Sequence, residues 1–232
     1  MSPPGKLSRV PILCYVTNRQ GLASADQHQI EALLQRIAMV AAAGTDWIQI
    51  REKDFSGKQL SSFTRAAVAQ IKLVNERNGT QTRILVNDRL DVALSEHTSG
   101  VHLGEQSVPV LDVCKLLAGK PNLAEPDKFL VGASCHSVPA ALSAARDNAD
   151  YIFFGPVFAT PSKASFGAPQ GLSRLAEVCS AISIPVLAIG GITLDNASDC
   201  FAAGAAGIAA IRLFQDAENL AVLVSELRAS FR

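Results

Sequence analysis

The stretch Trp47-Ile-Gln-Ile-Arg-Glu-Lys53, followed by a helical pattern over Ser56–Asn78, is one unit of a strand-then-helix pattern that repeats along the chain. Short apolar or β-branched runs typical of strands occur eight times. These runs are Ile12–Thr17, Trp47–Ile50, Ile84–Asn87, Gly100–Leu103, Phe129–Ser134, Tyr151–Phe154, Val186–Ile189 and Gly207–Ile211. They are apolar throughout and do not alternate with polar residues, which indicates a parallel sheet covered by helices.

Segments with helical spacing lie between these runs, and several begin with Ser or Asp as a capping residue. The clearest are Asp26–Ala43, Ser56–Asn78, Ser137–Arg146, Leu172–Ala181, Asp195–Ala203 and Ala217–Phe231, whereas the segments after the third and fourth strands are weaker helices. Four glycines fall where a helix should stop before the next strand. They are Gly44, Gly100, Gly204 and Gly207.

Eight strand-helix units close naturally into a single (β/α)8 TIM barrel, an α/β fold. We therefore predict one domain over residues 1–232, with a barrel core at about 12–225 and a flexible N-terminal extension at 1–10. An open doubly wound sheet is the alternative, but no GxGxxG follows the first strand and no change of composition marks a second domain. The stretch Gly119–Asp127 is expected to be a surface loop.

Composition narrows the class of protein. Hydrophobic residues make up 48% and charged residues 18% of the 232 residues, which excludes a disordered chain. Lys plus Arg and Asp plus Glu both number 21, so no net charge attracts nucleic acid or an anionic membrane. Five cysteines without a CxxC pair, no membrane span and no signal peptide predict a cytoplasmic protein. Monomer and homo-oligomer both stay open.

In a barrel the active site is built at the carboxyl ends of the strands, so polar residues there are informative. After the second strand, Gln49, Arg51 and Lys53 are two residues apart and are expected to project to the same side. An amide and two cations at the mouth of the barrel, the end where the strands' carboxyl ends meet, suit an anionic ligand. The alternative is that Arg51 and Lys53 are solvated or paired with Glu52 and Asp54.

The third and fifth strands end in further polar groups. Asn87 could hydrogen-bond a heterocycle and Asp88 could ligate a hard cation, although an Asp before a helix is also ordinary capping chemistry. Ser134 and His136 place a hydroxyl and an imidazole at the same rim. His136 is either structural or a general acid/base, and Ser137 is expected to cap the next helix.

The segment Gly155–Gly171 after the sixth strand is too long and too rich in Gly and Pro for a simple turn, so it is expected to form an active-site lid. Thr160 and Ser162 offer hydroxyls and Lys163 a cation, a set suited to phosphate. The alternative is a polar surface loop. We interpret these residues as part of a binding site.

The last two strands close with Gly190-Gly191 and Ile211-Arg212. Glycines after strand seven let backbone amides approach a ligand, and many barrels bind phosphate with the loops after strands seven and eight. We therefore predict that a phosphate or sulfate binds beside Gly191 and Ile211–Arg212, where the Arg212 guanidinium adds positive charge.

Taken together, these motifs resemble the thiamine phosphate synthase and TenI family from about Ile12 to Leu223. The matching stretches are Trp47-Ile-Gln-Ile-Arg-Glu-Lys53, Val86-Asn-Asp-Arg89, Gly100-Val-His-Leu-Gly104, Gly155-Pro-Val-Phe-Ala-Thr-Pro-Ser-Lys163 and Ile184-Pro-Val-Leu-Ala-Ile-Gly-Gly-Ile-Thr193. The resemblance implies a barrel that joins 4-amino-2-methyl-5-(diphosphomethyl)pyrimidine to a thiazole phosphate, releasing diphosphate and yielding thiamine phosphate.

The resemblance also implies roles for residues. The pyrimidine diphosphate would be held by Gln49, Arg51, Lys53, Asn87, Ser134 and Lys163, and the thiazole phosphate by Thr160, Ser162, Gly191, Ile211 and Arg212. Asp88 would ligate Mg²⁺. Lys163, Arg51 and Mg²⁺ would stabilise the negative charge that grows on the leaving diphosphate, and no covalent nucleophile is required.

Two residues depart from the family pattern. Ser107 stands where the synthases usually have an Asp that is the second metal ligand, and Arg212 stands where a small Ser usually contacts the thiazole phosphate. TenI-type thiazole tautomerases share the barrel, lack the full metal set and are thought to use the His of a motif that Ser134-Cys-His136-Ser137 matches. A tautomerase and a non-catalytic thiazole- or thiamine-phosphate-binding protein are therefore the alternatives to a synthase.

Overall fold

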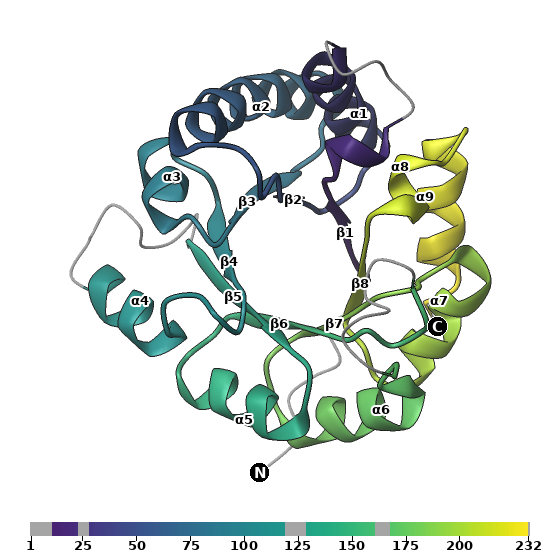
Figure 1. Cartoon of the computed structure of the whole chain (residues 1–232). Helices are drawn as coiled ribbons and strands as arrows, with labels where there is room; N and C mark the ends of the chain where they lie inside the picture. The colour runs from purple at the N-terminus through teal and green to yellow at the C-terminus, as the bar shows by residue number, and fades with distance from the viewer. Residues whose placement is uncertain (1–10, 23–27, 119–128, 161–167, 232) are drawn as a thin grey trace.

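A computed structural model of the protein describes residues 11–22, 28–118, 129–160 and 168–231. The described strands form a closed, all-parallel barrel in which each strand pairs with the next and the eighth pairs with the first (Figure 1). The strands are β1 (Ile12–Val16), β2 (Trp47–Ile50), β3 (Arg83–Asn87), β4 (Gly100–Leu103), β5 (Leu130–Cys135), β6 (Tyr151–Phe154), β7 (Val186–Ile189) and β8 (Gly207–Ala210). The predicted fold class is therefore confirmed.

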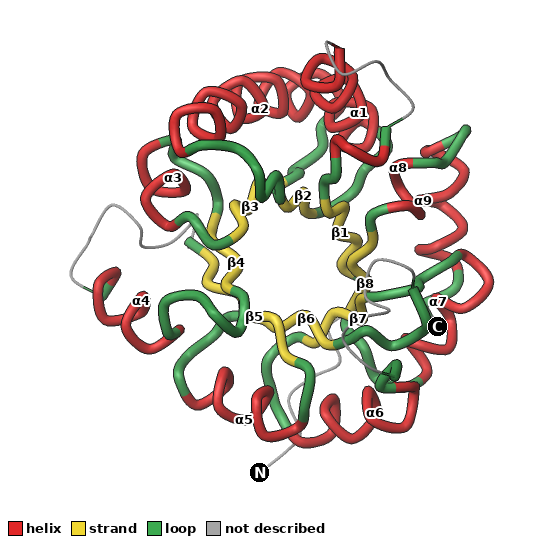
Figure 2. The backbone as a smooth tube through the Cα atoms, in the orientation of Figure 1, coloured by secondary structure: helices red, strands yellow, loops and turns green. Residues whose placement is uncertain are grey.

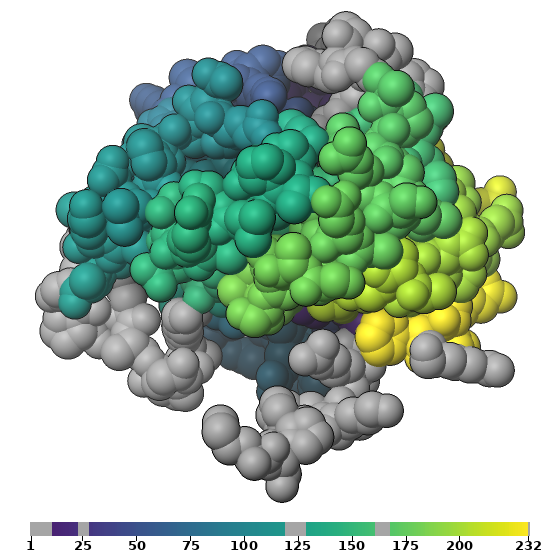
Figure 3. Space-filling view, turned by 90° about the horizontal axis from the view of Figure 1, so that it is seen from below, coloured from purple at the N-terminus to yellow at the C-terminus, as the bar shows by residue number. Residues whose placement is uncertain are grey.

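Helices form a ring outside the strands (Figure 2). They are α1 (Gln29–Ala42), α2 (Gly57–Asn78), α3 (Leu90–Ser95), α4 (Val110–Leu117), α5 (Val138–Arg146), α6 (Gly171–Ala181), α7 (Leu194–Ala202), α8 (Arg212–Gln215) and α9 (Leu220–Ala229), with a short 3-10 helix η1 (Arg19–Gly21) after β1. The helices after the third and fourth strands are short, as expected. Seen from below in the space-filling view, the teal and green middle of the chain occupies the centre of the visible face, with earlier residues in blue at the upper left and the C-terminal part in yellow at the right (Figure 3).

Local capping explains several helix starts. The Ser56 side chain accepts a hydrogen bond from the Gln59 backbone N–H, and the Gln59 side chain bonds back to Ser56, so α2 begins where the sequence predicts. Ser137 caps α5 in the same way, by accepting from the backbone N–H of Ala140 at 3.2 Å. The predicted cap at Ser137 is thus confirmed.

The C-terminal part differs from the prediction in detail. The strand predicted to reach Ile211 ends at Ala210, and residues 212–215 form the separate helix α8 instead of a turn. The last helix begins at Leu220 because the Asn219 side chain accepts from the Val222 backbone N–H at 3.1 Å.

The four glycines have two different roles. Gly44 and Gly204 follow helices with φ of 90° and 96°, a left-handed conformation that glycine adopts without strain. Gly100 and Gly207 are instead the first residues of β4 and β8, where a Cβ would collide with a carbonyl oxygen of the neighbouring strand. The prediction that these two glycines end a helix is wrong, since they allow close approach of strands.

Apolar side chains form two layers, one on each face of the strands. One lies between the strands and the helices, and the other fills the inside of the barrel. The inner layer consists of Cys14, Val16, Leu85, Tyr151, Phe153, Leu187 and Ala209. Because side chains alternate along a strand, Gln49 and Asn87 follow Trp47 and Leu85 on the inner face at the carboxyl ends of β2 and β3. The inner core is therefore topped by polar side chains.

Some predictions fall outside the described residues. The extension at 1–10 and the whole loop at Gly119–Asp127 are among them, so a single domain over 1–232 stays a prediction. All five cysteines are described, and none of them forms a disulfide. Among the residues that the structure describes, no helix combines the length and apolar character that crossing a bilayer requires.

Candidate active site

The first part of the site joins the ends of β2 and β3. Gln49 is only 2% exposed, and its Nε2 donates a hydrogen bond to Oδ1 of Asn87 at 2.9 Å. The Asn87 amide in turn donates to Oδ2 of Asp88 at 2.6 Å. The structure therefore brings together three of the predicted site residues in one chain of hydrogen bonds.

Arg51 does not pair with its acidic neighbours. Both Glu52 and Asp54 instead form ion pairs with Arg19, which follows β1. Burial lowers the pKa of the half-buried Arg51 guanidinium, while the nearby negative charges of Asp88 and Glu52 raise it. Arginine keeps its charge under these conditions. The alternative in which Glu52 and Asp54 neutralise Arg51 through ion pairs is thus wrong for the described residues.

The backbone of Arg51 is held by the end of β1. Its N–H donates to the Thr17 hydroxyl oxygen at 2.9 Å, and this hydroxyl donates to the buried Glu52 carboxylate at 2.7 Å. Lys53 lies further along, in an exposed turn. Strand alternation ends with β2 at Ile50, so the predicted alignment of Lys53 with Gln49 does not follow from the sheet.

Asp88 is not a helix cap. Helix α3 begins at Leu90, and the capping position is taken by Arg89 without a side-chain bond. Asp88 itself has a φ of 62°, an uncommon conformation for a residue other than glycine. The capping alternative is therefore wrong, and the exposed carboxylate is available for other contacts.

The Asp88 carboxylate contacts the loop after β4. Its Oδ1 accepts from the Gly104 backbone N–H at 3.0 Å and from the Ser107 hydroxyl, which also accepts from the Gly104 N–H at 2.8 Å. Ser107 thus lies beside the predicted metal ligand. Sequence separation of 19 residues makes this a contact that only the barrel creates.

The donor set around Asp88 is sparse. Within the described ranges, no three His, Cys, Asp or Glu residues gather closely enough to hold a metal ion by themselves. Glu105, which follows β4, turns away and accepts from the backbone N–H of His136 at 3.2 Å. One carboxylate and one hydroxyl, Asp88 and Ser107, are the oxygen donors that a hard cation would find.

His136 and Ser134 have different partners, although both lie at the end of β5. The Nδ1 of His136 bonds to the carbonyl oxygen of Gly155, at the start of the segment after β6. Because a carbonyl only accepts, Nδ1 carries the proton and Nε2 of a neutral ring is the acceptor. Cys135 lies between Ser134 and His136 in the sequence. Burial raises the pKa of its thiol to about 12, so this cysteine is not a thiolate nucleophile.

Two buried residues that the sequence did not single out, His102 and Tyr151, lie inside the barrel next to Ser134 of this rim. The His102 ring lies between the hydroxyl of Tyr151, 3.1 Å from Nδ1, and the hydroxyl of Ser134, 2.9 Å from Nε2. A signal was available, since His102 is a polar residue within an apolar strand run. Register pairs it with Asn87, so the alternation of β3 and β4 places it on the inner face.

The described part of the segment after β6 packs on the loop after β7. The backbone N–H groups of Val157 and Phe158 donate to the carbonyl oxygens of Ile189 and Gly190, at 2.9 and 3.0 Å. Gly191 has a φ of 66°, and a Cβ there would lie 2.6 Å from the Ala159 carbonyl oxygen. This close packing is a structural reason for glycine after strand seven, beside the predicted approach to phosphate.

The remaining predicted residues are only partly placed. Thr160 is half-buried, Ile211 borders the inner core and Arg212 is exposed at the start of α8. Ser162 and Lys163 lie outside the described residues, and so does the middle of the predicted lid, residues 161–167.

Comparison with known proteins gives a consistent result. The profile of the family described as thiamine monophosphate synthase (TMP-TENI) matches residues 15–214. The chain belongs to this family. Among its relatives, the thiamine-phosphate synthase of Methanoculleus marisnigri is 43% identical over 173 residues, 75% of each chain. That of Chloroflexus aurantiacus is 36% identical over 217 residues, 93% of this chain and 90% of the relative.

A solved structure agrees. The thiamine phosphate pyrophosphorylase of Pyrococcus furiosus superposes with a TM-score of 0.74 at 27% identity, covering 97% of this chain and 98% of that one. The resemblance predicted from the motifs is confirmed. The chain is a transferase of the thiamine monophosphate synthase family, whose members form thiamine phosphate in thiamine biosynthesis.

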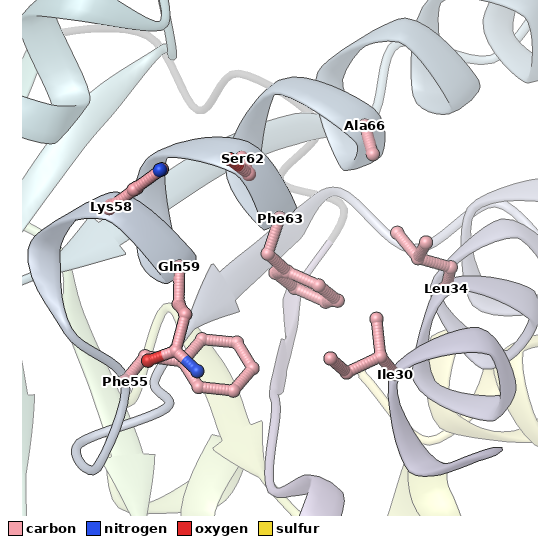
Figure 4. Close-up of a pocket in the computed structure, with 8 residues that line it drawn as sticks. All are labelled: Ile30, Leu34, Phe55, Lys58, Gln59, Ser62, Phe63 and Ala66. Carbon is pink, nitrogen blue, oxygen red and sulfur yellow. The ribbon is translucent and has the colours of Figure 1, made fainter. Parts of the chain in front are cut away.

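The structure also contains a pocket on the outside of the barrel, separate from the predicted active site. It has a volume of about 320 Å³ and lies between α1 and α2 (Figure 4). Its lining residues are Ile30, Leu34, Phe55, Lys58, Gln59, Ser62, Phe63 and Ala66. None of the predicted site residues lines it, so the pocket is distinct from the barrel mouth.

Proposed function

We propose that this chain joins 4-amino-2-methyl-5-(diphosphomethyl)pyrimidine to a thiazole phosphate, releasing diphosphate and yielding thiamine phosphate. The observation that carries the proposal is the hydrogen-bonded chain from Gln49 through Asn87 to Asp88, with the half-buried Arg51 directly after β2, the strand that carries Gln49. It combines groups for a heterocycle and for an anion at one mouth.

Recognition of the pyrimidine would fall to the two amides. The bond between Gln49 and Asn87 uses one donor and one acceptor, which leaves the Gln49 carbonyl oxygen and further amide N–H groups for a ligand. An aminopyrimidine offers both ring nitrogen acceptors and an amino donor. Because Gln49 is buried, its orientation is fixed before the substrate arrives.

The diphosphate would lie against cationic groups. Arg51, Lys53 and Lys163 supply positive charge, and Ser134 supplies a hydroxyl. Arg51 suits this role because it makes no ion pair with the described acidic residues and has lost part of its hydration by burial. Charge that develops on a leaving group is stabilised most by groups that are already in place.

Magnesium fits the donors around Asp88. Mg²⁺ commonly binds one or two carboxylates, substrate phosphates and water, so Asp88 with the Ser107 hydroxyl would hold it only in part. Bound there, it would neutralise charge on the departing diphosphate. The single carboxylate indicates that substrate phosphate oxygens and water complete the coordination.

The thiazole phosphate would be bound on the opposite side of the mouth. Thr160, Ser162, Gly191 and the Ile211–Arg212 turn are the groups in question. Support comes from the packing of the segment after β6 on the loop after β7, which brings Ala159 next to Gly191. The exposed Arg212 guanidinium can then bind a phosphate through two parallel N–H···O hydrogen bonds.

The reaction needs orientation and electrostatics more than a protein nucleophile. The bond between the pyrimidine methylene and the diphosphate oxygen breaks, the electron pair leaves with diphosphate, and the thiazole nitrogen attacks the cation-like methylene. Lys163 and Arg51 would stabilise the leaving group while the mouth holds both reactants together. The protonated Cys135 thiol agrees with a mechanism that forms no covalent enzyme intermediate.

A thiazole tautomerase is the second candidate, favoured by one observation. The bond from His136 Nδ1 to the Gly155 carbonyl leaves Nε2 as a proton acceptor at the rim. A tautomerase moves a proton and would therefore depend on His136, without a metal. In a synthase the same histidine would position the segment after β6.

One assay tests the proposal against both alternatives. The purified protein is mixed with both phosphorylated precursors, with and without Mg²⁺, and thiamine phosphate and diphosphate are measured. A synthase produces both in equal amounts, and His136→Asn retains part of the activity. Absence of thiamine phosphate at any Mg²⁺ concentration contradicts the proposal; thiazole isomerisation lost in His136→Asn then indicates a tautomerase, and binding without turnover a binding protein.

The cysteines and the proposed substrates also bear on the cellular compartment. We propose a cytoplasmic enzyme that acts on small molecules, because none of the five cysteines forms a disulfide, which is typical of a reducing compartment. A homo-oligomer stays a prediction.

A further inference from the structure

A line of three hydrogen-bonding side chains crosses the inside of the barrel beneath the mouth. The Tyr151 hydroxyl on β6 lies 3.1 Å from Nδ1 of His102 on β4, and Nε2 of the same ring lies 2.9 Å from the Ser134 hydroxyl oxygen on β5. Tyr151 is fully buried and His102 is 1% exposed. Ser134, the half-buried end of the line, is the one nearest the mouth.

Packing fixes this line in place. The His102 ring lies against the Phe153 ring, with centroids 4.1 Å apart and planes 32° from parallel. Gly132 pairs with both His102 and Tyr151 in the sheet, and a Cβ at Gly132 would collide with the Tyr151 ring. The missing side chain on β5 is therefore what lets the phenol reach across to the imidazole.

The direction of the hydrogen bonds follows from the buried end. Among the described residues, the Tyr151 hydroxyl has His102 as its only hydrogen-bond partner. Burial raises the pKa of Tyr151 well above its usual value, so the phenol keeps its proton. A buried O–H group that fails to donate is costly, which makes the phenol the donor and Nδ1 of His102 the acceptor.

The imidazole then has one arrangement. A charged ring buried among aromatic side chains would be strongly destabilised, so the neutral ring carries its single proton on Nε2. That N–H donates to the oxygen of Ser134. Since the Ser134 oxygen is now an acceptor, its own proton points to another group. The opposite arrangement would have Ser134 donate to His102 and turn only lone pairs toward the mouth.

We propose that His102 is a positioning residue which, oriented by Tyr151, makes the Ser134 hydroxyl a hydrogen-bond donor to a diphosphate oxygen of the substrate. This inference rests on the proposed function for the identity of the ligand, but not for the direction of the hydrogen bonds. An anion needs a donor, and Ser134 has only one proton to give. Losing that direction turns a stabilising contact into a repulsive one.

The direction is tested first without any substrate. The full chain, labelled with ¹⁵N histidine, has four histidines, and the His102 signals are assigned by their loss in His102→Gln. We expect the Nε2-protonated form for His102 and the Nδ1-protonated form for His136, which donates to the Gly155 carbonyl and serves as an internal reference. A His102 ring protonated on Nδ1 overturns the proposal.

Coupling to Ser134 is tested by a double-mutant cycle. His102→Asn should lower kcat/KM about 10- to 100-fold, the range seen when a supporting hydrogen-bond partner is removed from a ligating group. In a Ser134→Ala background the same change should cost little more, because the group that it orients is gone. A merely structural role of His102 lowers both backgrounds equally, and that result overturns the proposal.

Two conservative substitutions distinguish the proposed role from a general loss of folding. Tyr151→Phe keeps the ring and removes only the hydroxyl, and Tyr15→Phe is its matched control. Tyr15 is also fully buried and donates to the Gln215 side chain at 3.1 Å, but it belongs to the outer layer. We expect similar losses of thermal stability in both variants and a loss of kcat/KM only in Tyr151→Phe. Equal kcat/KM in the two variants contradicts the proposed line.

Failure of the proposed function is kept apart from failure of this inference. Calorimetric titration with inorganic diphosphate and Mg²⁺ repeats the cycle without turnover. If the wild-type chain forms no thiamine phosphate, the proposed function fails, while the tautomer and the diphosphate cycle still decide the role of His102. If the chain is active but diphosphate affinity is unchanged in both Ser134→Ala and His102→Asn, only the inference fails.

Discussion

The two ends of the barrel differ in how far their polar and charged side chains are already occupied by hydrogen bonds and ion pairs. At the amino ends of the strands, Asp46 accepts from the Leu13 backbone N–H at 2.7 Å and pairs with Arg228 of α9 at 3.1 Å. Arg228 also donates to the carbonyl oxygens of Pro11 and Gly44, at 2.8 and 2.7 Å. Charges at this end are thus engaged with one another and with the backbone, and they fasten the last helix to the first two strands.

At the carboxyl ends, polar groups keep bonding capacity for a ligand. Gln49 and Asn87 use only part of theirs on each other, and Arg51 takes no share in the ion pairs of the neighbouring carboxylates. The comparison indicates that residues at one end contribute to stability and those at the other to binding and chemistry. Changes at the two ends should therefore have separable effects.

The largest effect is expected from Lys163, which the sequence alone assigns to the mouth. Lys163→Ala should lower kcat about 100- to 1,000-fold with little change in thiazole KM, because its partner gains charge only as diphosphate leaves. Steady-state kinetics measures both constants. Lys115→Ala, on the exposed face of α4, is the matched control. An unchanged kcat with a raised KM would show that Lys163 only docks the substrate.

At the opposite end, Arg228→Met should lower the free energy of unfolding by about 2 kcal/mol, since charge-assisted hydrogen bonds are lost from a partly buried site. Urea denaturation measures this, with Arg146→Met on the exposed end of α5 as the control. We expect kcat/KM of the folded enzyme to stay as in the wild type. A loss of activity without a loss of stability would break the division between the two ends.

The metal site offers a finer test within the mouth. Ser107→Asp adds a second carboxylate beside Asp88 and should lower the Mg²⁺ concentration for half-maximal thiamine phosphate formation about tenfold. Ser107→Ala, which removes the hydroxyl without adding charge, is the control and should not lower it. Superimposable Mg²⁺ titrations of Ser107→Asp and the wild type would show that Ser107 is not at the metal site.

The smallest effect concerns Arg19 and Asp54, a charged pair at the mouth with a structural role. The Arg19 guanidinium lowers the pKa of Asp54 to about 2 from its usual value near 4. A lowered pKa in the folded state stabilises the protein above pH 4, and this contribution is lost as the pH falls toward 2.

Because Asp54 is 46% exposed, Asp54→Asn should cost less than about 1 kcal/mol at pH 7. Denaturation of both proteins at several pH values checks this, and the difference should vanish near pH 2. The variant should keep its kcat. A difference that grows on acidification would contradict the assignment of the pKa shift to Arg19.

What the sequence by itself determined is local. Eight apolar strand runs, the intervening helices and the caps at Ser56 and Ser137 all depend on residues within a few positions of one another, and all appear in the structure. The resemblance placed Gln49 and Asn87 in one binding site, and the structure joins them by a hydrogen bond between the ends of neighbouring parallel strands. Strand alternation does not extend to Lys53, because the strand ends at Ile50.

Only the tertiary structure decided which partner each polar side chain takes. Asp88 proved to contact Ser107 rather than cap a helix, Glu52 proved to pair with Arg19 more than 30 residues away, and His102 proved to join Tyr151 to Ser134. Side-chain hydrogen bonds act over about 3 Å, and the register of strands far apart in the chain sets which groups come that close. No local pattern contains that information.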